Sequence, residues 1–517
     1  MISPMISVIV TFHAEGAVAQ RTLQGIERLR RYAEYNGIEV EFVSVLDCAD
    51  AETILAVKSS SVLRNNDQVI EVSNRDLGAS RNSGIQVARG NFIGIFDGDD
   101  YYTDNWLVEA LRVSKAAVDN LIVHPELQIS FGSVHCVAHV LDMNEHPDYP
   151  MQNCLAVHPW IACSFGAKSI YEKHPYCRTD TKKTGFGFED WQWNLETIAK
   201  GGRHVSAPST AHYYRRKSSS MLTEMLALGA VIPPTEFFDH PERWNVELGS
   251  NSELFTYSNK KKSNILVPQW AIEGFRQIAE IEPELYPTKE FLGRFFLYTP
   301  PLDLAPGELY AKVFALLGEF RPDIICLVPS LAWGDDVDAE WQKTFSARTI
   351  GQKALVISCN SDDSQLNKLV SEKFKLLEFG ELARNYTENQ QIQVLTRLIL
   401  QSTASEIYVI KSPIGWELIK RHSKSFIASN KRIYVSISNR GTDQDPNVIG
   451  EQYHTEITPW LHEYATDSNL AQSQTTIWER MTPKCTLSQE PADKLLIGNR
   501  HHRIFRLIKR FLLNKSM

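Results

Sequence analysis

The sequence predicts an α/β protein with two successive sheets. Short β-branched runs alternate with helical patterns near the N-terminus, with strands expected at residues 7–11, 40–46 and 92–96 and a helix at 17–36. A second series of candidate strands, again separated by helical segments, lies at residues 324–328, 354–358, 407–410 and 432–436. This alternation is typical of sheets with helices on both faces, which bind ligands at the carboxyl ends of their strands.

Length and composition restrict the class of protein. A chain of 517 residues is too long for one ordinary domain, and 43% hydrophobic with 22% charged residues is typical of a folded globular protein. The formal net charge of −8 provides no overall cationic field, which argues against nucleic acid as a partner.

The sequence favours the cytoplasm. Its eight cysteines are scattered without a CxxC pair, which indicates reduced, mostly buried thiols. The N-terminus has no basic segment of a secretory signal, and no apolar stretch approaches the roughly 18–20 residues that cross a bilayer. We therefore expect a protein that does not span the membrane.

Four regions follow from the composition along the chain. A polar stretch containing Lys260, Lys261 and Lys262 suggests a linker at 241–265, between a first domain at 1–240 and a Rossmann-like domain at 266–492. Residues 493–517 contain a basic amphipathic helix. This helix could contact an anionic membrane as a peripheral anchor, or dock on the protein itself or on another subunit.

Three carboxylates, Asp97, Asp99 and Asp100, follow an expected buried strand. Aspartates at a strand end can hold a divalent cation, and oxygen ligands suit Mg²⁺ or Mn²⁺. The alternative is an acidic turn with Gly98 in a left-handed conformation. His212 could complete the metal shell, and the basic run that begins at Arg215 could hold phosphate oxygens.

Two further segments carry candidate residues. A glycine-containing segment at the start of a helix, with Asp76, Gly78, Arg81 and Asn82, suits close approach of a nucleotide, and Asp47 ends a strand where it could accept hydrogen bonds from a base or ribose. Each of these residues could instead cap a helix or satisfy a turn.

The second segment contains Glu189 and Asp190. A carboxylate beside an apolar wall can take the proton of an attacking hydroxyl, so Asp190 is the candidate base; equally, both acids could complement the dipole of a helix over 191–199. Trp160 and Trp191 are candidate acceptor contacts, although Trp191, like Trp193, is as consistent with a core position.

In this order, the motifs resemble the family 2 glycosyltransferases of GT-A fold, in particular bacterial enzymes of surface-polysaccharide synthesis, over residues 5–222. The resemblance implies an inverting, single-displacement transfer from a nucleotide-sugar, of UDP type, to a glycan or lipid-linked acceptor, as in O-antigen or capsule synthesis. Asp97 and Asp99 match the DxD motif, and Glu189 with Asp190 matches the ED motif. The residues implied to bind the nucleotide-sugar are Thr11, Phe12, Asp47, Asp76, Gly78, Arg81, Asn82, Asp97 and Arg215.

The second domain resembles the N-terminal half of a GT-B glycosyltransferase, on residues 324–333, 412–417 and 466–469. Two other functions remain open: a nucleotidyltransferase, and a catalytically inactive glycan-binding scaffold. A nucleotidyltransferase would need a basic loop after the first strand, but residues 11–16 contain no lysine or arginine. Oligomerisation is left open.

Overall fold

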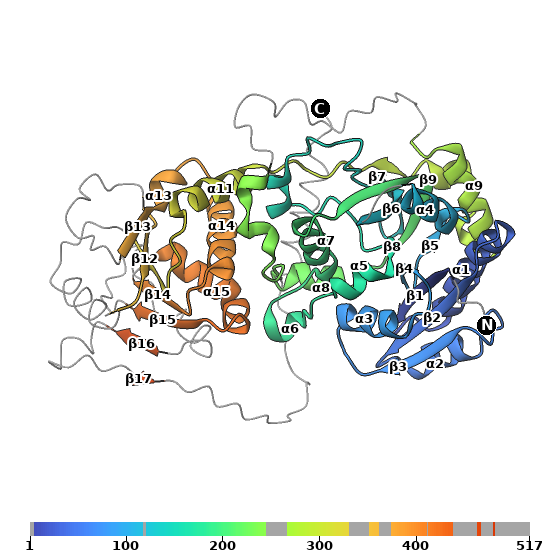
Figure 1. The fold of residues 1–517 in the computed structure, drawn as a ribbon, viewed down its shortest axis with the longest axis horizontal. Coiled ribbons are helices and arrows are strands. Elements are labelled where there is room, and N and C mark those ends of the chain that lie inside the picture. Colours follow the sequence, from blue (N-terminus) through green and yellow to red (C-terminus); the bar gives the residue numbers. More distant parts are fainter. Residues whose placement is uncertain are drawn as a thin grey trace. The chain divides into compact units, whose positions relative to one another are not determined.

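The structure is a computed structural model that describes residues 5–116, 120–244, 266–329, 351–360, 374–410, 412–437, 463–466 and 479–480. These residues form two sheets (Figure 1). Most of the expected linker, at 245–265, and the expected C-terminal helix at 493–517 lie outside the described residues.

The first sheet is mixed and has ten strands. Its main path runs β10-β7-β6-β8-β4-β1-β2-β3, and β9 pairs with β6 and β5. Strands β1 to β4 are mutually parallel, β8 runs antiparallel to β4, and β9 is parallel to β6. The strands are β1 (Ile6–Phe12), β2 (Val40–Asp47), β3 (Gln68–Val72), β4 (Phe92–Asp97), β5 (Tyr101–Tyr102), β6 (Leu121–Gly132), β7 (Cys136–His139), β8 (Ser164–Ala167), β9 (Arg203–Arg216) and β10 (Phe296–Leu297).

Helices cover both faces of this sheet, as expected. Val8 of β1 packs in a cluster with Leu23 of α1, whereas the adjacent Ile9 packs with Ile85 of α3 on the other face. Burial of both faces explains why β1 is apolar almost throughout. The helices of this part are α1 (Ala17–Tyr35), α2 (Ala51–Lys58), α3 (Leu77–Val87), α4 (Trp106–Lys115), α5 (Lys168–Lys173), α6 (Thr181–Thr184), α7 (Glu189–Ala199) and α8 (Met221–Ala227).

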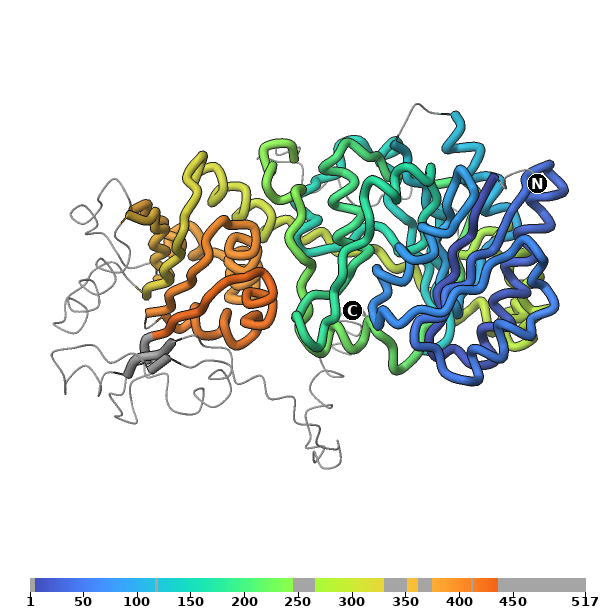
Figure 2. The backbone as a smooth tube through the Cα atoms, turned by 60° about the horizontal axis from the view of Figure 1, so that its bottom comes forward, coloured from blue at the N-terminus to red at the C-terminus, as the bar shows by residue number. Residues whose placement is uncertain are grey.

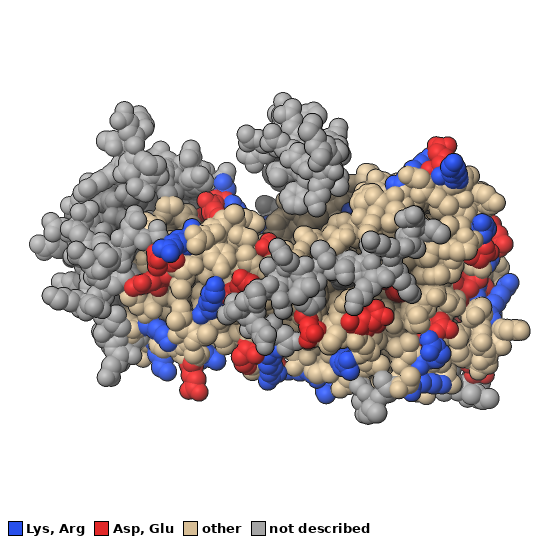
Figure 3. All heavy atoms as spheres, turned by 90° about the horizontal axis from the view of Figure 1, so that it is seen from above, with Lys and Arg blue, Asp and Glu red and all other residues tan. Residues whose placement is uncertain are grey.

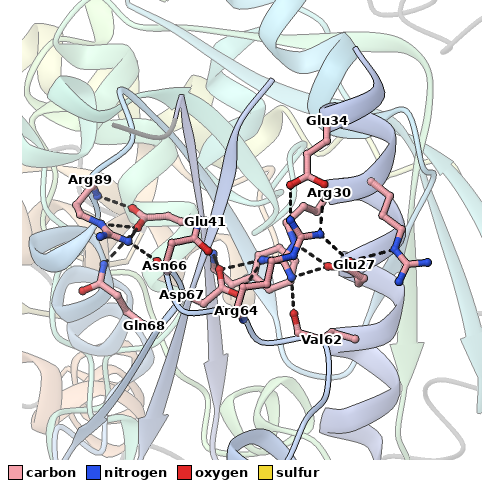
Figure 4. A network of polar contacts seen from close by, with 12 residues as sticks. Glu27, Arg30, Glu34, Glu41, Val62, Arg64, Asn66, Asp67, Gln68 and Arg89 are labelled. Atoms are coloured by element: carbon pink, nitrogen blue, oxygen red, sulfur yellow. Dashed lines mark hydrogen bonds and ion pairs between the residues drawn. The ribbon is translucent and has the colours of Figure 1, made fainter. Parts of the chain in front are cut away.

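A buried ionic network joins α1 to the segment before β3 (Figure 4). Arg30 is fully buried, and it donates hydrogen bonds to Glu27, to both carboxylate oxygens of Asp67 at 2.9 and 2.7 Å, and to the carbonyl of Val62. Its guanidinium lies 3.8 Å from the centroid of the Phe42 ring. The ion pairs and hydrogen bonds of this network offset the desolvation penalty of burying its charges.

Residues 266–298 pack on the first sheet, although the sequence placed them in the second domain. Strand β10 pairs with β7, and Phe275 of α9 contacts the Tyr213 ring at 4.6 Å between centroids. This part contains α9 (Gln269–Ile278), η4 (Pro283–Leu285) and α10 (Lys289–Leu292). The expected boundary at 266 is therefore wrong, and the strands of the second sheet begin at residue 324.

The second sheet has the order β13-β12-β11-β14-β15-β16-β17 and is parallel apart from β17. Its parallel strands, numbered from the first in the chain, follow a 3-2-1-4-5-6 order, which is that of a doubly wound Rossmann-like sheet. Figures 1 and 2 show its helices beside these strands. The elements are α11 (Ala305–Leu317), β11 (Ile324–Val328), β12 (Ala354–Ser358), β13 (Phe374–Glu378), α13 (Phe379–Leu382), α14 (Glu388–Gln401), β14 (Glu406–Ile410), α15 (Pro413–Ala428), β15 (Arg432–Ile437), β16 (Glu463–Thr466) and β17 (Glu479–Arg480).

Within the described residues, no helix has both the length and the hydrophobicity needed to cross a bilayer. On the face drawn in Figure 3, the described acidic and basic side chains are interspersed. Among the described residues, this face shows no cationic surface.

Candidate active site

Two acidic motifs that are far apart in the sequence meet at Arg81. This residue lies on α3, and its side chain is fully buried. Its Nη1 donates to Glu189 Oε1 at 2.8 Å and its Nη2 donates to Asp97 Oδ1 at 3.0 Å. The end of β4 and the start of α7 are thus joined through one guanidinium.

The buried charges shift one another's pKa values. Burial raises the pKa of Glu189 to about 7, against the opposing effect of Arg81, and the neighbouring carboxylate of Asp190 adds to the rise. Burial alone would lower the pKa of Arg81, but Asp97 and Glu189 outweigh it, so this pKa lies above its ordinary value. Arg81 is therefore a permanent cation between two acids.

The acidic loop after β4 is fixed by close contacts. An added Cβ at Gly98 would lie 2.5 Å from Phe12 Cδ1 and 2.6 Å from the Thr11 carbonyl oxygen, so glycine is required by close approach to β1. The alternative of a left-handed Gly98 is wrong, because its φ is not positive. The Asp99 carboxylate lies 2.7 Å from Lys217 Nζ and is partly exposed.

Asp100 points into the protein. It is fully buried, and its carboxylate lies 2.7 Å from His212 Nε2 and accepts a 2.7 Å hydrogen bond from the Arg215 main chain. Burial raises the pKa of Asp100 to about 7, while His212 acts in the opposite direction. The third acid of the motif therefore anchors β9 to the acidic loop.

The structure does not place His212 in a shared ligand set with Asp97 and Asp99. Its Nε2 lies against the Asp100 carboxylate, and its Nδ1 is buried without a hydrogen-bond partner. The described residues contain no group of three or more His, Cys, Asp or Glu side chains that could hold a metal ion. The donors that fit Mg²⁺ or Mn²⁺ are the carboxylate oxygens of Asp97 and Asp99, which are hard ligands at one strand end.

Arg215, expected to bind phosphate, is engaged within the protein. Its Nη1 and Nη2 donate to the two oxygens of Glu282 at 2.9 and 2.6 Å, and its Nε donates to the Asp99 carbonyl at 2.9 Å. A bidentate pair of this kind is among the stronger polar contacts. The guanidinium thus supports the acidic loop, and a phosphate would have to compete with Glu282.

The residues around the start of α3 hold this helix in place. Asp47 accepts hydrogen bonds from the main chain of Arg75 and Asp76 and from Ser80 Oγ, at 3.0, 3.1 and 2.8 Å. The Asp76 carboxylate caps α3 at Ala79 N and accepts a 2.7 Å bond from Thr179 N. Direct contact of either acid with a nucleotide stays a prediction.

Gly78 and Asn82 connect α3 to the segment at 176–177. A Cβ at Gly78 would lie 2.4 Å from the Cys177 carbonyl oxygen, and the Asn82 amide exchanges two hydrogen bonds with the Tyr176 main chain, at 2.8 and 3.0 Å. Thr11 and Phe12 are buried at the end of β1. Their predicted contacts with the donor likewise remain predictions.

Asp190 lies in the first turn of α7 with a side chain 22% exposed. Its Oδ1 accepts a 2.9 Å hydrogen bond from the Trp191 main chain, and its Oδ2 is 3.9 Å from His158 Nδ1. The Trp191 ring is stacked on His158, with 5.5 Å between ring centroids. The partly exposed carboxylate remains accessible to a substrate hydroxyl.

Trp160 is not available as a stacking surface for an acceptor. Its side chain is buried, and its Nε1 donates to the Leu141 carbonyl at 3.1 Å. Sequence reasoning also missed His158 and Glu282. No local pattern marks either residue, because their partners Asp190 and Arg215 are 32 and 67 residues away in the chain.

A mixed sheet with helices on both faces and paired aspartates at the end of β4 defines a GT-A type of domain. Residues 7–128 match the family model described as Glycosyl transferase family 2, which agrees with this type of domain. The matched residues include Asp97 and Asp99 and end before Glu189 and Asp190.

Among curated proteins, "Putative glycosyltransferase EpsH" of Bacillus subtilis (strain 168) is 32% identical over 123 residues, which are 24% of this chain. The match covers 34% of EpsH, so the chain spans about a third of that relative. Among solved structures, S. aureus TarS aligns over 54% of this chain and 49% of its own, with 16% identity and a TM-score of 0.30.

Proposed function

We propose that this protein is an inverting glycosyltransferase that transfers a sugar from a UDP-linked donor to a glycan or lipid-linked acceptor in bacterial surface-polysaccharide synthesis. The family 2 match of residues 7–128 supports the reaction class. The observation that carries the proposal is the Arg81 bridge, because it brings the DxD aspartate Asp97 and the ED glutamate Glu189 to one guanidinium.

In the proposed reaction, the acceptor hydroxyl oxygen attacks the anomeric carbon and forms the new glycosidic bond. The hydroxyl proton passes to the Asp190 carboxylate, and the bond from the anomeric carbon to the diphosphate breaks with its electron pair on the phosphate oxygen. A divalent cation, Mn²⁺ or Mg²⁺, held by Asp97 and Asp99 would neutralise the charge on that diphosphate. Glu189, held by Arg81, fixes the start of α7 and so positions Asp190.

The test is a panel of nucleotide-sugars incubated with the full-length protein and Mn²⁺ or Mg²⁺, with release of nucleoside diphosphate as the readout. We expect Asp190→Asn and Asp99→Asn to lose turnover while the matched control at an exposed acid, Asp148→Asn, keeps it.

Three results would overturn the proposal. Turnover of no nucleotide-sugar combined with glycan binding would indicate an inactive scaffold. Release of pyrophosphate from a nucleoside triphosphate would indicate a nucleotidyltransferase. Full turnover by Asp190→Asn would remove Asp190 as the base.

A further inference from the structure

His158 and Asn194 form a polar arrangement beside the candidate base. Asp190 and Asn194 are four residues apart on α7 and therefore share one face of the helix. The His158 ring contacts both: its Nε2 lies 2.9 Å from Asn194 Nδ2, and its Nδ1 lies 3.9 Å from Asp190 Oδ2. Stacking on Trp191, with only 8° between the ring planes, fixes the orientation of the imidazole.

The Asn194 contact determines where the imidazole carries its proton. Asn194 Nδ2 is an amide nitrogen and can only donate, so His158 Nε2 must accept. A neutral histidine has one N–H, which then has to be at Nδ1, on the side of Asp190. Burial lowers the pKa of His158, against the opposing effect of Asp190, so the ring is neutral near neutral pH.

We propose that His158 is a positioning residue that directs an Nδ1–H group at Asp190 Oδ2 and so orients the carboxylate for proton abstraction. The inference rests on the proposed function, because it assigns Asp190 the role of base. Asp190 Oδ1 is already held by the Trp191 main chain at 2.9 Å, and a second donor at Oδ2 would fix the plane of the carboxylate. The present separation of 3.9 Å closes as substrate binds, since catalytic hydrogen bonds are often long in the free enzyme.

A neutral donor suits this role better than a cation. A lysine or arginine at this distance would stabilise the charged form of the carboxylate and make it a weaker base. A neutral imidazole orients the carboxylate and leaves most of its basicity. Asn194 is therefore as much a part of the arrangement as His158, because it selects the proton position.

The first test measures the tautomer directly. In ¹⁵N-histidine-labelled full-length protein, two-bond ¹⁵N–¹H correlations distinguish Nδ1–H from Nε2–H, and the spectrum of His158→Gln assigns the signal. We expect the Nδ1–H form for wild type and the Nε2–H form for Asn194→Asp, because a carboxylate at 194 would accept from Nε2. An Nε2–H form in wild type would overturn the proposal, whatever the activity.

The second test is kinetic. We expect His158→Phe to lower kcat by about 10- to 100-fold, the range for a misplaced catalytic group, with the KM for the nucleotide-sugar unchanged. His158→Gln, which keeps an N–H donor, should recover part of this loss, and Asn194→Asp should resemble His158→Phe. The control is His139→Phe, at an exposed position on β7.

Failure of this inference is distinguishable from failure of the proposed function. A wild type that turns over no nucleotide-sugar would contradict the proposed function. The NMR experiment would still show whether the His158 proton lies at Nδ1. An active wild type with unchanged kcat in His158→Phe would contradict only the positioning role. If His158→Phe does not fold, Asn194→Asp with its native ring supplies the kinetic comparison.

Discussion

Arg81 donates a 2.8 Å hydrogen bond to Glu189, a residue 108 positions further along the chain, and both side chains are buried. Since neither group has water as an alternative partner, the pair joins α3 to the start of α7. Arg81 also binds Asp97, so the position of Asp97 relative to Asp190 depends on this hydrogen bond.

Loss of the guanidinium should damage both stability and activity. We expect Arg81→Met to lower the free energy of unfolding by about 3–5 kcal/mol, because it leaves buried Glu189 without its counter-ion. Turnover should fall with it. Urea denaturation and nucleoside diphosphate release measure the two effects. The control is Arg178→Met, an exposed arginine whose contact is to the Asn74 carbonyl; an equal loss in that variant would contradict the prediction.

Glu189 should make stability depend on pH. Its folded-state pKa is raised from 4.5 to about 7. A raised pKa means that the fold favours the protonated form, so this contribution to stability is intact below pH 4.5 and lost as pH rises through 7. Between these values, the unfolding free energy of wild type minus that of Glu189→Gln should fall by roughly 1–3 kcal/mol.

Urea titrations of both proteins at a series of pH values measure this difference. Asp100, whose pKa is also raised to about 7, is present in both proteins, so its contribution cancels to a first approximation. A difference that is constant between pH 4.5 and 7 would show that Glu189 is not the group that titrates.

Lys217 should compete with a divalent cation for Asp99. The ammonium lies 2.7 Å from the carboxylate, so a cation at Asp99 must displace it or share the oxygen. We expect Lys217→Met to lower the Mn²⁺ concentration for half-maximal activity roughly two- to five-fold, the value of an exposed ion pair. Because Asp99→Asn should lose turnover, its affinity for Mn²⁺ is measured by direct binding, and we expect it to be at least about tenfold weaker than that of wild type.

The control for Lys217→Met is Lys182→Met. It removes an exposed lysine that pairs with Glu224, and it should leave the Mn²⁺ dependence unchanged. A Mn²⁺ requirement that is the same in Lys217→Met and in wild type would argue that the cation does not use Asp99.

Arg30 should be important for stability alone. It is fully buried against Glu27 and Asp67 on the network of Figure 4, so we expect Arg30→Met to cost about 3–5 kcal/mol. Arg31 also pairs with Glu27 but is 75% exposed, and Arg31→Met should cost less than about 1 kcal/mol. Chemical denaturation compares the two, and similar losses would contradict the argument from burial.

Much of the fold could be predicted from local patterns. The strand expected at 324–328 is β11 without change, and the helix expected at 17–36 is α1 to within one residue. Such segments carry their own periodicity. The sequence did not predict the pairing of β10 with β7 or of β9 with β6, because these depend on contacts between distant segments.

In the candidate site, too, local patterns could be predicted from the sequence, whereas contacts between distant residues could not. The family motifs led to the prediction of Asp97, Asp99 and Asp190 as site residues, since each lies in a recognisable local pattern. Arg81 was expected to bind nucleotide, but its two carboxylate partners lie in other parts of the chain and only the fold brings them to it. The Glu282 contact of Arg215 was missed for the same reason.

The return of residues 266–298 to the first sheet changes how a minimal enzyme should be designed. A fragment that stops at residue 240 would lack Glu282 and leave the Arg215 guanidinium without its carboxylate partner. Such a fragment would also lack β10, which pairs with β7, and would expose the apolar side chains that pack against α9. Both changes favour aggregation. An expression fragment that contains the first sheet should therefore extend to at least residue 298.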